Sequence, residues 1–297
     1  MFDKNEILYT FGKSYHISHN QDFFCCVGSS VHLYDFNNGK SVYNFKNIKN
    51  PSCSEFMPDK NLIVKTTTGH YYVYDLVSMN LIKKILLSKG MYASTADFKT
   101  TSDNKYIIDF SYIFPISKLM ITDIETKEHI LFDIGNSRGG CILKTESNSK
   151  YYVVTKCAET VDSPDISTNV FYELTYKSGQ FKLKELFSEK GRFSLTDYCS
   201  NRFACADYSN KITIFDIEKN VKDKFEYNSN DVLYDLKLSK SGNLIALAES
   251  QNIYIYDLKS KKNIKTYDVD YGCFVDFLDN DTKLLVGTWE KGYCVSL

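Results

Sequence analysis

A short strand-like motif returns along the chain and limits the folds that are open to it. Its clearest copy lies in Gln251 to Thr266, where alternating residues end at Asp257, followed by a polar turn and a second strand. This hairpin occurs seven times, about every forty residues. The acid that ends its first strand is Asp35, Asp75, Asp123, Glu173, Asp216 or Asp257, and the seventh copy is Gly292 to Leu297. A repeat of this length predicts similar supersecondary units rather than one irregular core.

Two further strand-like runs joined by a polar turn precede each hairpin. Clear cases are residues 55–64, 238–247 and 277–286, whose turns are rich in Asn, Asp, Ser, Gly or Pro. Four strands in about forty residues are the content of one β-propeller blade. The sequence therefore predicts an all-β fold, a seven-bladed β-propeller with four-stranded antiparallel blades, as a single domain over residues 1–297.

The two ends of the chain complete this strand count. The seventh copy ends at its third strand, whereas the strand-like residues 6–11 precede the first inner strand and are one strand too many. Because pairing the two would remove exposed strand edges, we expect residues 5–12 to complete the C-terminal blade as its outer strand.

With these features the chain resembles the WD40-like β-propellers, including the YVTN and quinoprotein-like repeats. The resemblance covers essentially the whole chain and rests on turns similar to F-S-P-D-G-K-x-L and on the aromatic-Asp ending of the third strand. The endings are Tyr-Asp, Phe-Asp or Thr-Asp instead of Trp-Asp, and the only tryptophan is Trp289. Gly69-His70 lies in a turn between the second and third strands and does not open a blade. The resemblance implies a binding face formed by the loops between blades and by the turns joining second to third strands.

Composition narrows the choice of partner and compartment. The net charge is −1, without the basic excess typical of nucleic-acid binding, and no run approaches the length of a membrane span. The nine cysteines form no CxxC pair and mostly lie in apolar strand-like runs, which favours free thiols in a reducing compartment. We expect a cytoplasmic protein, monomeric on its own, that binds another protein and neither nucleic acid nor membrane.

The candidate binding residues lie where the repeat is interrupted. Two longer segments, 110–118 and 158–168, separate second from third strands in the third and fourth blades, and the latter contains Asp162 and Asp165. Two of the three arginines, Arg138 and Arg192, lie in glycine-flanked segments expected to join neighbouring blades. We interpret these segments as surface loops, and the arginine fork suits a carboxylate or phosphate.

Large amphipathic residues also stand at comparable starts of inner strands. Tyr15, Tyr92 and Tyr271 share this position with Arg192, and Tyr and Arg are common in interaction hot spots. The sequence thus predicts a binding face whose centre lies near blades 3 to 5.

Acidic residues recur in the predicted inner strands and support a rival, enzymatic hypothesis. They are Glu55, Asp97, Asp197, Asp235 and Asp276. By resemblance to propeller lactonases, such acids near the axis could bind a cation in a metal-dependent hydrolase, although they could equally be solvated residues without a function. Since no catalytic motif such as GxSxG or HExxH occurs, we expect no catalytic residues, no metal and no cofactor. Our interpretation is a non-enzymatic protein-interaction scaffold, with the hydrolase and a carbohydrate or small-ligand binder as alternatives.

Overall fold

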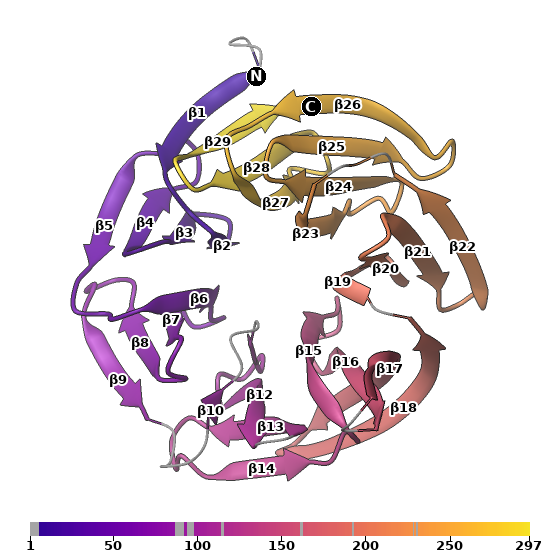
Figure 1. The fold of residues 1–297 in the computed structure, drawn as a ribbon. Helices are drawn as coiled ribbons and strands as arrows, with labels where there is room; N and C mark the ends of the chain where they lie inside the picture. Colours follow the sequence, from indigo (N-terminus) through magenta and orange to yellow (C-terminus); the bar gives the residue numbers. More distant parts are fainter. Residues whose placement is uncertain are drawn as a thin grey trace. The chain divides into compact units, whose positions relative to one another are not determined.

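The strands of the chain form seven antiparallel sheets, and in all but one of them the members follow one another in sequence order. The exception joins the N-terminal strand to the three C-terminal strands. The structure is a computed structural model that describes residues 6–86, 92–93, 98–113, 116–160, 163–191, 193–227, 229 and 231–297. Within these residues there is no helix, and every strand belongs to one of the seven sheets. The predicted all-β, seven-bladed β-propeller is therefore confirmed (Figure 1).

The chain separates into two compact units, residues 1–46 with 193–297 and residues 47–192, called unit 1 and unit 2 below. Unit 1 contains four blades, numbered by chain order. Blade 1 is β2 (His16–His19), β3 (Phe23–Val27), β4 (Val31–Asp35) and β5 (Ser41–Phe45), and blade 5 is β19 (Phe193–Cys199), β20 (Arg202–Asp207), β21 (Lys211–Asp216) and β22 (Val221–Glu226). Blade 6 is β23 (Leu233–Leu238), β24 (Leu244–Glu249), β25 (Asn252–Asp257) and β26 (Lys262–Asp268). Blade 7 is β27 (Gly272–Leu278), β28 (Lys283–Thr288), β29 (Lys291–Ser296) and β1 (Ile7–Gly12).

Unit 2 contains the other three blades. Blade 2 is β6 (Pro51–Phe56), β7 (Asn61–Thr66), β8 (Tyr71–Asp75) and β9 (Leu81–Ile85). Blade 3 has its innermost strand in two pieces, β10 (Tyr92–Ala93) and β11 (Lys99–Thr100), which both pair with β12 (Tyr106–Ile113), followed by β13 (Ile116–Asp123) and β14 (His129–Phe132). Blade 4 is β15 (Ser137–Lys144), β16 (Lys150–Thr160), β17 (Ser163–Lys177) and β18 (Gln180–Lys190).

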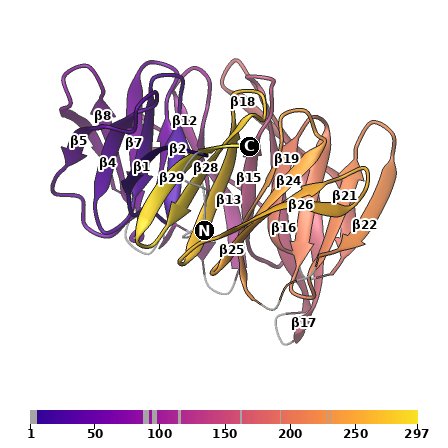
Figure 2. The same ribbon diagram turned by 90° about the horizontal axis from the view of Figure 1, so that it is seen from above.

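The N-terminal strand completes blade 7, as the strand count predicts. β1 pairs antiparallel with β29, from Ile7 opposite Val295 to Gly12 opposite Lys291. Figures 1 and 2 show this strand beside the C-terminal strands of unit 1. Phe11 is buried there against Phe24 and Tyr34 of blade 1. The pairing of β1 with β29, called the clasp below, thus buries an aromatic side chain as well as a strand edge.

The repeated acid of the hairpin closes the turn that follows it. Asp35 Oδ1 accepts hydrogen bonds from the N–H groups of Asn37 and Asn38, at 2.9 and 3.2 Å. Asp123 does the same for Glu125 and Thr126. Asp side chains favour such turns because they replace a backbone acceptor. The repeat therefore identifies a turn residue and not a ligand.

The apolar core lies between neighbouring blades. In unit 1 one cluster joins blades 5 and 6, including Ile212 and Leu236, and another joins blades 6 and 7, including Ile255 and Val286. In unit 2 comparable clusters join blade 2 to blade 3 and blade 3 to blade 4. Both faces of most strands are therefore covered, and the outer strands carry many of the exposed residues.

The two segments predicted to be loops are in fact extended hairpins. Residues 110–113 and 116–118 belong to the ends of β12 and β13, with Phe110 opposite Leu119. Residues 158–160 and 163–168 belong to β16 and β17, with Ala158 opposite Ser167. The loop interpretation was wrong because backbone pairing does not depend on side-chain polarity, so a departure from the repeat does not by itself end a strand.

Candidate functional site

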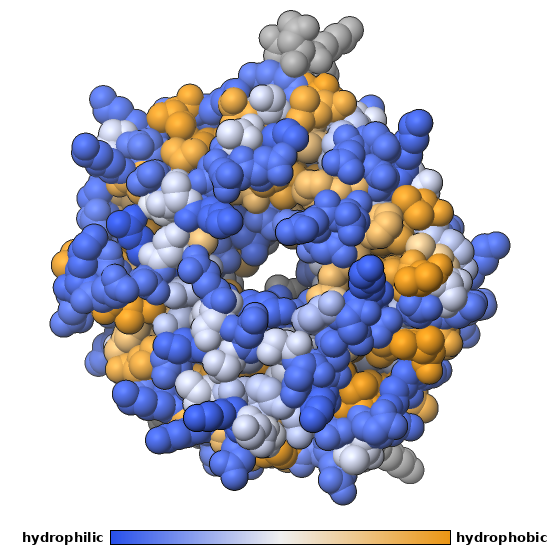
Figure 3. All heavy atoms as spheres, turned by 180° about the vertical axis from the view of Figure 1, so that it is seen from behind, coloured by the Kyte–Doolittle hydropathy of each residue, from blue (hydrophilic) through white to orange (hydrophobic). Residues whose placement is uncertain are grey.

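Unit 1 exposes large hydrophobic side chains at one edge, where its blades connect. The loops between blades and the turns joining second to third strands meet at the same end of the strands, because neighbouring strands are antiparallel. On the side of the molecule drawn in Figure 3, scattered hydrophobic groups interrupt a largely hydrophilic surface. We name as the aromatic face the exposed residues at this edge, which are Tyr15, Tyr208, Val232, Tyr234, Tyr271 and Trp289.

The centre of the aromatic face is the pair Tyr271 and Trp289 on blade 7. Their rings stack with centroids 6.0 Å apart and planes 27° apart, and the side chains are 59% and 61% exposed. An exposed stacked pair is notable because tryptophan is usually highly buried. These two residues therefore present a flat apolar platform to solvent.

The backbone holds this platform in place. Tyr271 has a φ of 56°, which is uncommon for an aromatic residue and requires support from its surroundings. Trp289 N–H donates to the Tyr271 carbonyl at 3.2 Å, and Gly272 N–H donates to Ser250 at 3.1 Å. A Cβ at Gly272 would lie 2.5 Å from the Glu249 carbonyl, so only glycine allows this close approach. The strained position is over-determined, as is common at binding sites.

The outlying members of the face are also held firmly. Tyr15 donates its hydroxyl hydrogen to the Gly28 carbonyl at 2.7 Å. Tyr208, 74% exposed, stands at the tip of a turn in which Asp207 accepts from Ser209 and Lys211. Rigid aromatic side chains lose little conformational entropy when they bind a partner.

The charges at this edge of unit 1 are mainly negative. The basic residues are Lys13, Lys46, Lys211 and Lys291, whereas the acids are Asp207, Glu226, Asp231, Asp268, Asp270 and Glu290. A cavity of about 620 Å³ opens beside Tyr271 and includes Asp268 and Asp270 in its lining. The face thus combines aromatic rings with carboxylates, which suits a partner that carries cationic side chains.

One buried acid lies behind this edge. Glu249 is 1% exposed, and its Oε1 atom makes no hydrogen bond to any described residue. Burial is the main cause that raises the pKa of the Glu249 carboxyl, and the nearby charge of Asp231 raises this pKa further. A hydrogen bond with Ser229 lowers it in part. Glu249 directly precedes Ser250, which lines the cavity beside Tyr271.

Two of the predicted binding residues, Tyr15 and Tyr271, lie on the aromatic face. Arg138, Tyr92 and Asp165 lie in strands β15, β10 and β17, and their side chains are outside the described residues, as are Arg192 and Asp162 altogether. The segment with Arg138 is a bulged strand start and not a loop, with the irregularity between Ser137 and Gly140.

Four members of the face were missed by sequence reasoning, namely Tyr208, Val232, Tyr234 and Trp289. Tyr208 and Trp289 occupy turns between second and third strands, where blades 1, 2 and 6 have glycine or polar residues. An aromatic residue at a turn position was the available signal, because core packing does not require it there.

The acids of the inner strands connect neighbouring blades. In unit 1, Asp197 of β19 accepts from the Leu238 N–H of β23 at 2.8 Å, and Asp235 of β23 accepts from the Val275 N–H of β27 at 3.0 Å. Asp276 of β27 lies 3.2 Å from the Nε2 atom of His19.

Unit 2 repeats the arrangement. Glu55 accepts from the Thr100 N–H of β11 at 2.7 Å and pairs with Lys144 of β15 at 3.0 Å. Asp97 is outside the described residues. The predicted inner-strand acids that are described therefore serve as ties between blades.

The protonation of the inner-strand acids in unit 1 depends on their burial and on the charge of Lys237, which attracts Asp197, Asp235 and Asp276. Burial is the main cause that raises the pKa of Asp235 to about 7, and it also raises the pKa of Asp197. Burial opposes ionisation of Asp276, but the bond from His19 and the charge of Lys237 bring its pKa below the ordinary value. In the described part of the chain, no three His, Cys, Asp or Glu side chains gather closely enough to hold a metal ion.

Comparison with known proteins leaves the family of the chain open. Neither a protein-family model nor a curated protein matches the sequence. Among the described residues there is also no helix with the length and apolar character needed to cross a membrane.

Proposed function

We propose that this chain is a non-enzymatic, WD40-like interaction scaffold whose aromatic face binds a protein that presents lysine or arginine side chains. The observation that carries the proposal is the stacked, solvent-exposed pair of Tyr271 and Trp289 beside the cavity with Asp268 and Asp270. Aromatic residues dominate interface hot spots, and a cation placed over such a ring is attracted to its face.

The proposed position of the face differs from the sequence-based expectation, whose residues in blades 3 and 4 lie outside the described side chains. Blades 3 to 5 were expected to form its centre, whereas the described exposed residues favour blades 5, 6, 7 and 1 of unit 1. Both the expectation and the proposal place the face at the edge formed by the loops between blades and the turns joining second to third strands. All nine cysteines are free thiols, which supports the further proposal of a reducing, cytoplasmic environment.

A metal-dependent hydrolase is the less favoured alternative. Its candidate acids accept backbone N–H groups or pair with Lys144, Lys237 or His19. Carboxylates engaged in this way would lose structural bonds on binding a metal. The small-ligand alternative has a specific observation in its favour, a cavity of about 900 Å³ at the other end of the strands of unit 1.

Photo-crosslinking tests the proposed face directly. A photoreactive amino acid replaces Trp289 or Tyr208, and Ile264 or Val221 on the outer strands serve as controls because their exposed fractions are comparable. We expect one partner to be crosslinked from the first two positions only, through a peptide rich in Lys or Arg. Crosslinking to the same partner from all four positions, or to an acidic peptide, contradicts the proposal.

Truncation then measures the contribution of the platform. Trp289→Ser and Tyr271→Asn, which keeps a residue tolerant of positive φ, should each weaken binding of the crosslinked partner about 30-fold. Ile264→Ser should leave the affinity unchanged. Because Trp289 is the only tryptophan, its fluorescence reports occupation of the face in the unmodified protein.

A further inference from the structure

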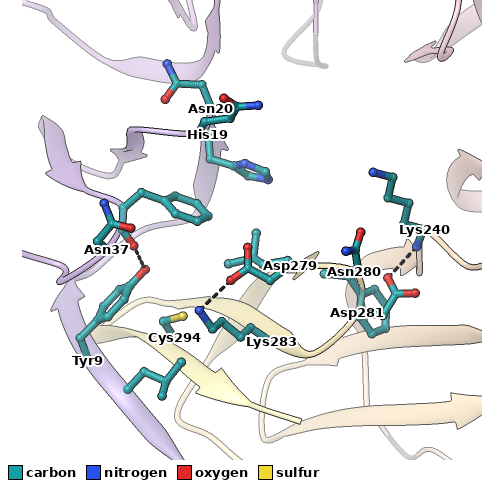
Figure 4. A pocket seen from close by; sticks show the side chains of 15 residues that line it. Tyr9, His19, Asn20, Asn37, Lys240, Asp279, Asn280, Asp281, Lys283 and Cys294 are labelled. Carbon is teal, nitrogen blue, oxygen red and sulfur yellow. Dashed lines mark hydrogen bonds and ion pairs between the residues drawn. The ribbon is translucent and has the colours of Figure 1, made fainter.

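A cavity of about 900 Å³ lies in unit 1 at the opposite end of the strands from the aromatic face (Figure 4). It is formed by β1, by turns of blades 1, 6 and 7, and by the ends of β27 and β29. Its lining residues are Leu8, Tyr9, His19, Asn20, Gln21, Phe36, Asn37, Lys240, Phe277, Leu278, Asp279, Asn280, Asp281, Lys283 and Cys294. This volume is within the usual range for small-molecule sites.

The walls of the cavity are held by hydrogen bonds between separate segments. Tyr9 donates its hydroxyl hydrogen to the Phe36 carbonyl at 2.7 Å, which joins the N-terminal strand to blade 1. Burial raises the pKa of the Tyr9 hydroxyl, so it remains a donor. Asp281 accepts from the N–H groups of Lys240 and Ser241 at 2.7 and 2.9 Å, which joins blade 7 to blade 6. The cavity is therefore built into the blade contacts.

Three consecutive wall residues adopt an unusual backbone conformation. Asp279, Asn280 and Asp281 have φ values of 48°, 54° and 69°. Residues other than glycine normally enter this region singly, although Asn and Asp do so most readily. The bonds made by Asp281 hold this turn, which places the Asn280 side chain at the cavity (Figure 4). Such held conformations are concentrated at ligand sites.

The charged groups of the cavity are largely paired with the protein itself. Lys283 lies 2.6 Å from Asp279, and both oxygens of Asp281 already accept backbone N–H groups. This leaves neither carboxylate available to a cation without loss of a bond. Lys240 is the one lysine of this lining whose ammonium has no ion pair to a described residue. A single available cation provides few charge-assisted hydrogen bonds, so the lining does not favour an anion.

The groups that remain available are neutral amides. No described residue bonds to the side-chain amides of Gln21, Asn37 and Asn280, and the Asn20 oxygen accepts from Asp22 and Phe23 while its NH₂ group has no described acceptor. An amide offers both donors and acceptors. A ligand that matches several amides must therefore also both donate and accept, as hydroxyl groups do.

Aromatic surfaces complete the cavity. Tyr9, Phe36 and Phe277 contribute apolar area, and Cys294 is buried beside them. A ligand with an apolar C–H face and a rim of hydroxyl groups satisfies both parts of the lining. We propose that this cavity is a binding site for a neutral saccharide, independent of the protein partner of the aromatic face.

Calorimetric titration of the full chain tests the site. The probes are glucose, galactose, mannose, N-acetylglucosamine, maltose, cellobiose and lactose, with glucuronate and inorganic phosphate as anionic competitors. We expect saturable binding of at least one neutral sugar and none of phosphate. Absence of binding for all the neutral sugars, or tighter binding of an anion, overturns the proposal.

Two variants locate the binding. Asn280→Gly keeps the positive φ while it removes the amide, and Asn37→Ala removes a second one; each should weaken sugar binding about five-fold. The matched control is Asn220→Gly, because Asn220 is exposed, has a φ of 51° and is absent from the cavity lining. Equal affinity in all variants contradicts the assigned site, and unchanged thermal midpoints show that each variant is folded.

Discussion

A fully buried ion pair between blades 2 and 3 allows a quantitative test of how unit 2 is held together. Lys65 of β7 and Asp109 of β12 lie 2.6 Å apart, and both side chains are 0% exposed. Asp109 also accepts hydrogen bonds from the Tyr71 hydroxyl and from the Phe110 N–H group. Burial raises the pKa of the Asp109 carboxyl, and Lys65 opposes that rise. One carboxylate therefore satisfies three groups at a blade contact.

The change Asp109→Ala should be severe. Breaking a buried pair costs about 3–5 kcal/mol because it leaves an uncompensated charge, and the Tyr71 hydroxyl loses its acceptor at a further cost of about 1–3 kcal/mol. The sum approaches the whole stability of a typical domain. We expect a decrease in the free energy of unfolding of at least about 4 kcal/mol, measured by urea denaturation with circular dichroism.

The triple variant Lys65→Met, Tyr71→Phe and Asp109→Leu distinguishes charge from packing. Replacing every polar member by an apolar residue of similar size is often neutral or stabilising, so most of the lost stability should return. The reasoning is refuted if Asp109→Ala costs less than about 1 kcal/mol. It is equally refuted if the triple variant is as unstable as the single one.

Two further changes test unit 1. Asp235 has a native pKa of about 7, above its unfolded value, so the native state holds more protons and stability should fall as pH rises from 5 to 8. The Asp235→Asn variant should not lose stability in this way. In urea titrations its free energy of unfolding, relative to that of the wild type, should therefore increase by about 2 kcal/mol between pH 5 and pH 8. Parallel pH profiles of the two proteins would show that Asp235 does not titrate in this range. Gly292→Ala should destabilise by about 1–3 kcal/mol, because its Cβ would lie 1.8 Å from the Phe11 ring. The double change with Phe11→Ala should be less than additive in thermal denaturation, and simple additivity would exclude this clash as the cause.

The fold could be predicted from the sequence because its determinants are local and repeated. Asp35 and Asp257 end equivalent strands and accept backbone N–H groups of the turns that follow, so the same residue type recurs for the same physical reason. The clasp of β1 on β29 also followed, since an unpaired strand at one end and a missing strand at the other leave exposed edges.

The candidate site was less predictable because exposure depends on the neighbouring blade. Tyr71 is fully buried at a blade contact, whereas Tyr208 is 74% exposed at a turn, although the sequence around each reads as strand and turn. Likewise, Asp235 was recognised as an inner-strand acid, but its partner Val275 lies forty residues away on another blade. Such pairings require the register of both strands, which a single sequence does not contain.

Strand β27 joins the two proposed sites of unit 1. Tyr271 of the aromatic face directly precedes it, and Asp279 of the saccharide cavity directly follows it. Between these ends, Asp235 accepts from Val275, and Asp276 pairs with His19. These bonds fix the middle of the strand to the blade on either side. The inner-strand acids of unit 1, first considered as metal ligands, are therefore better understood as ties that fix the strands on which the two proposed sites lie.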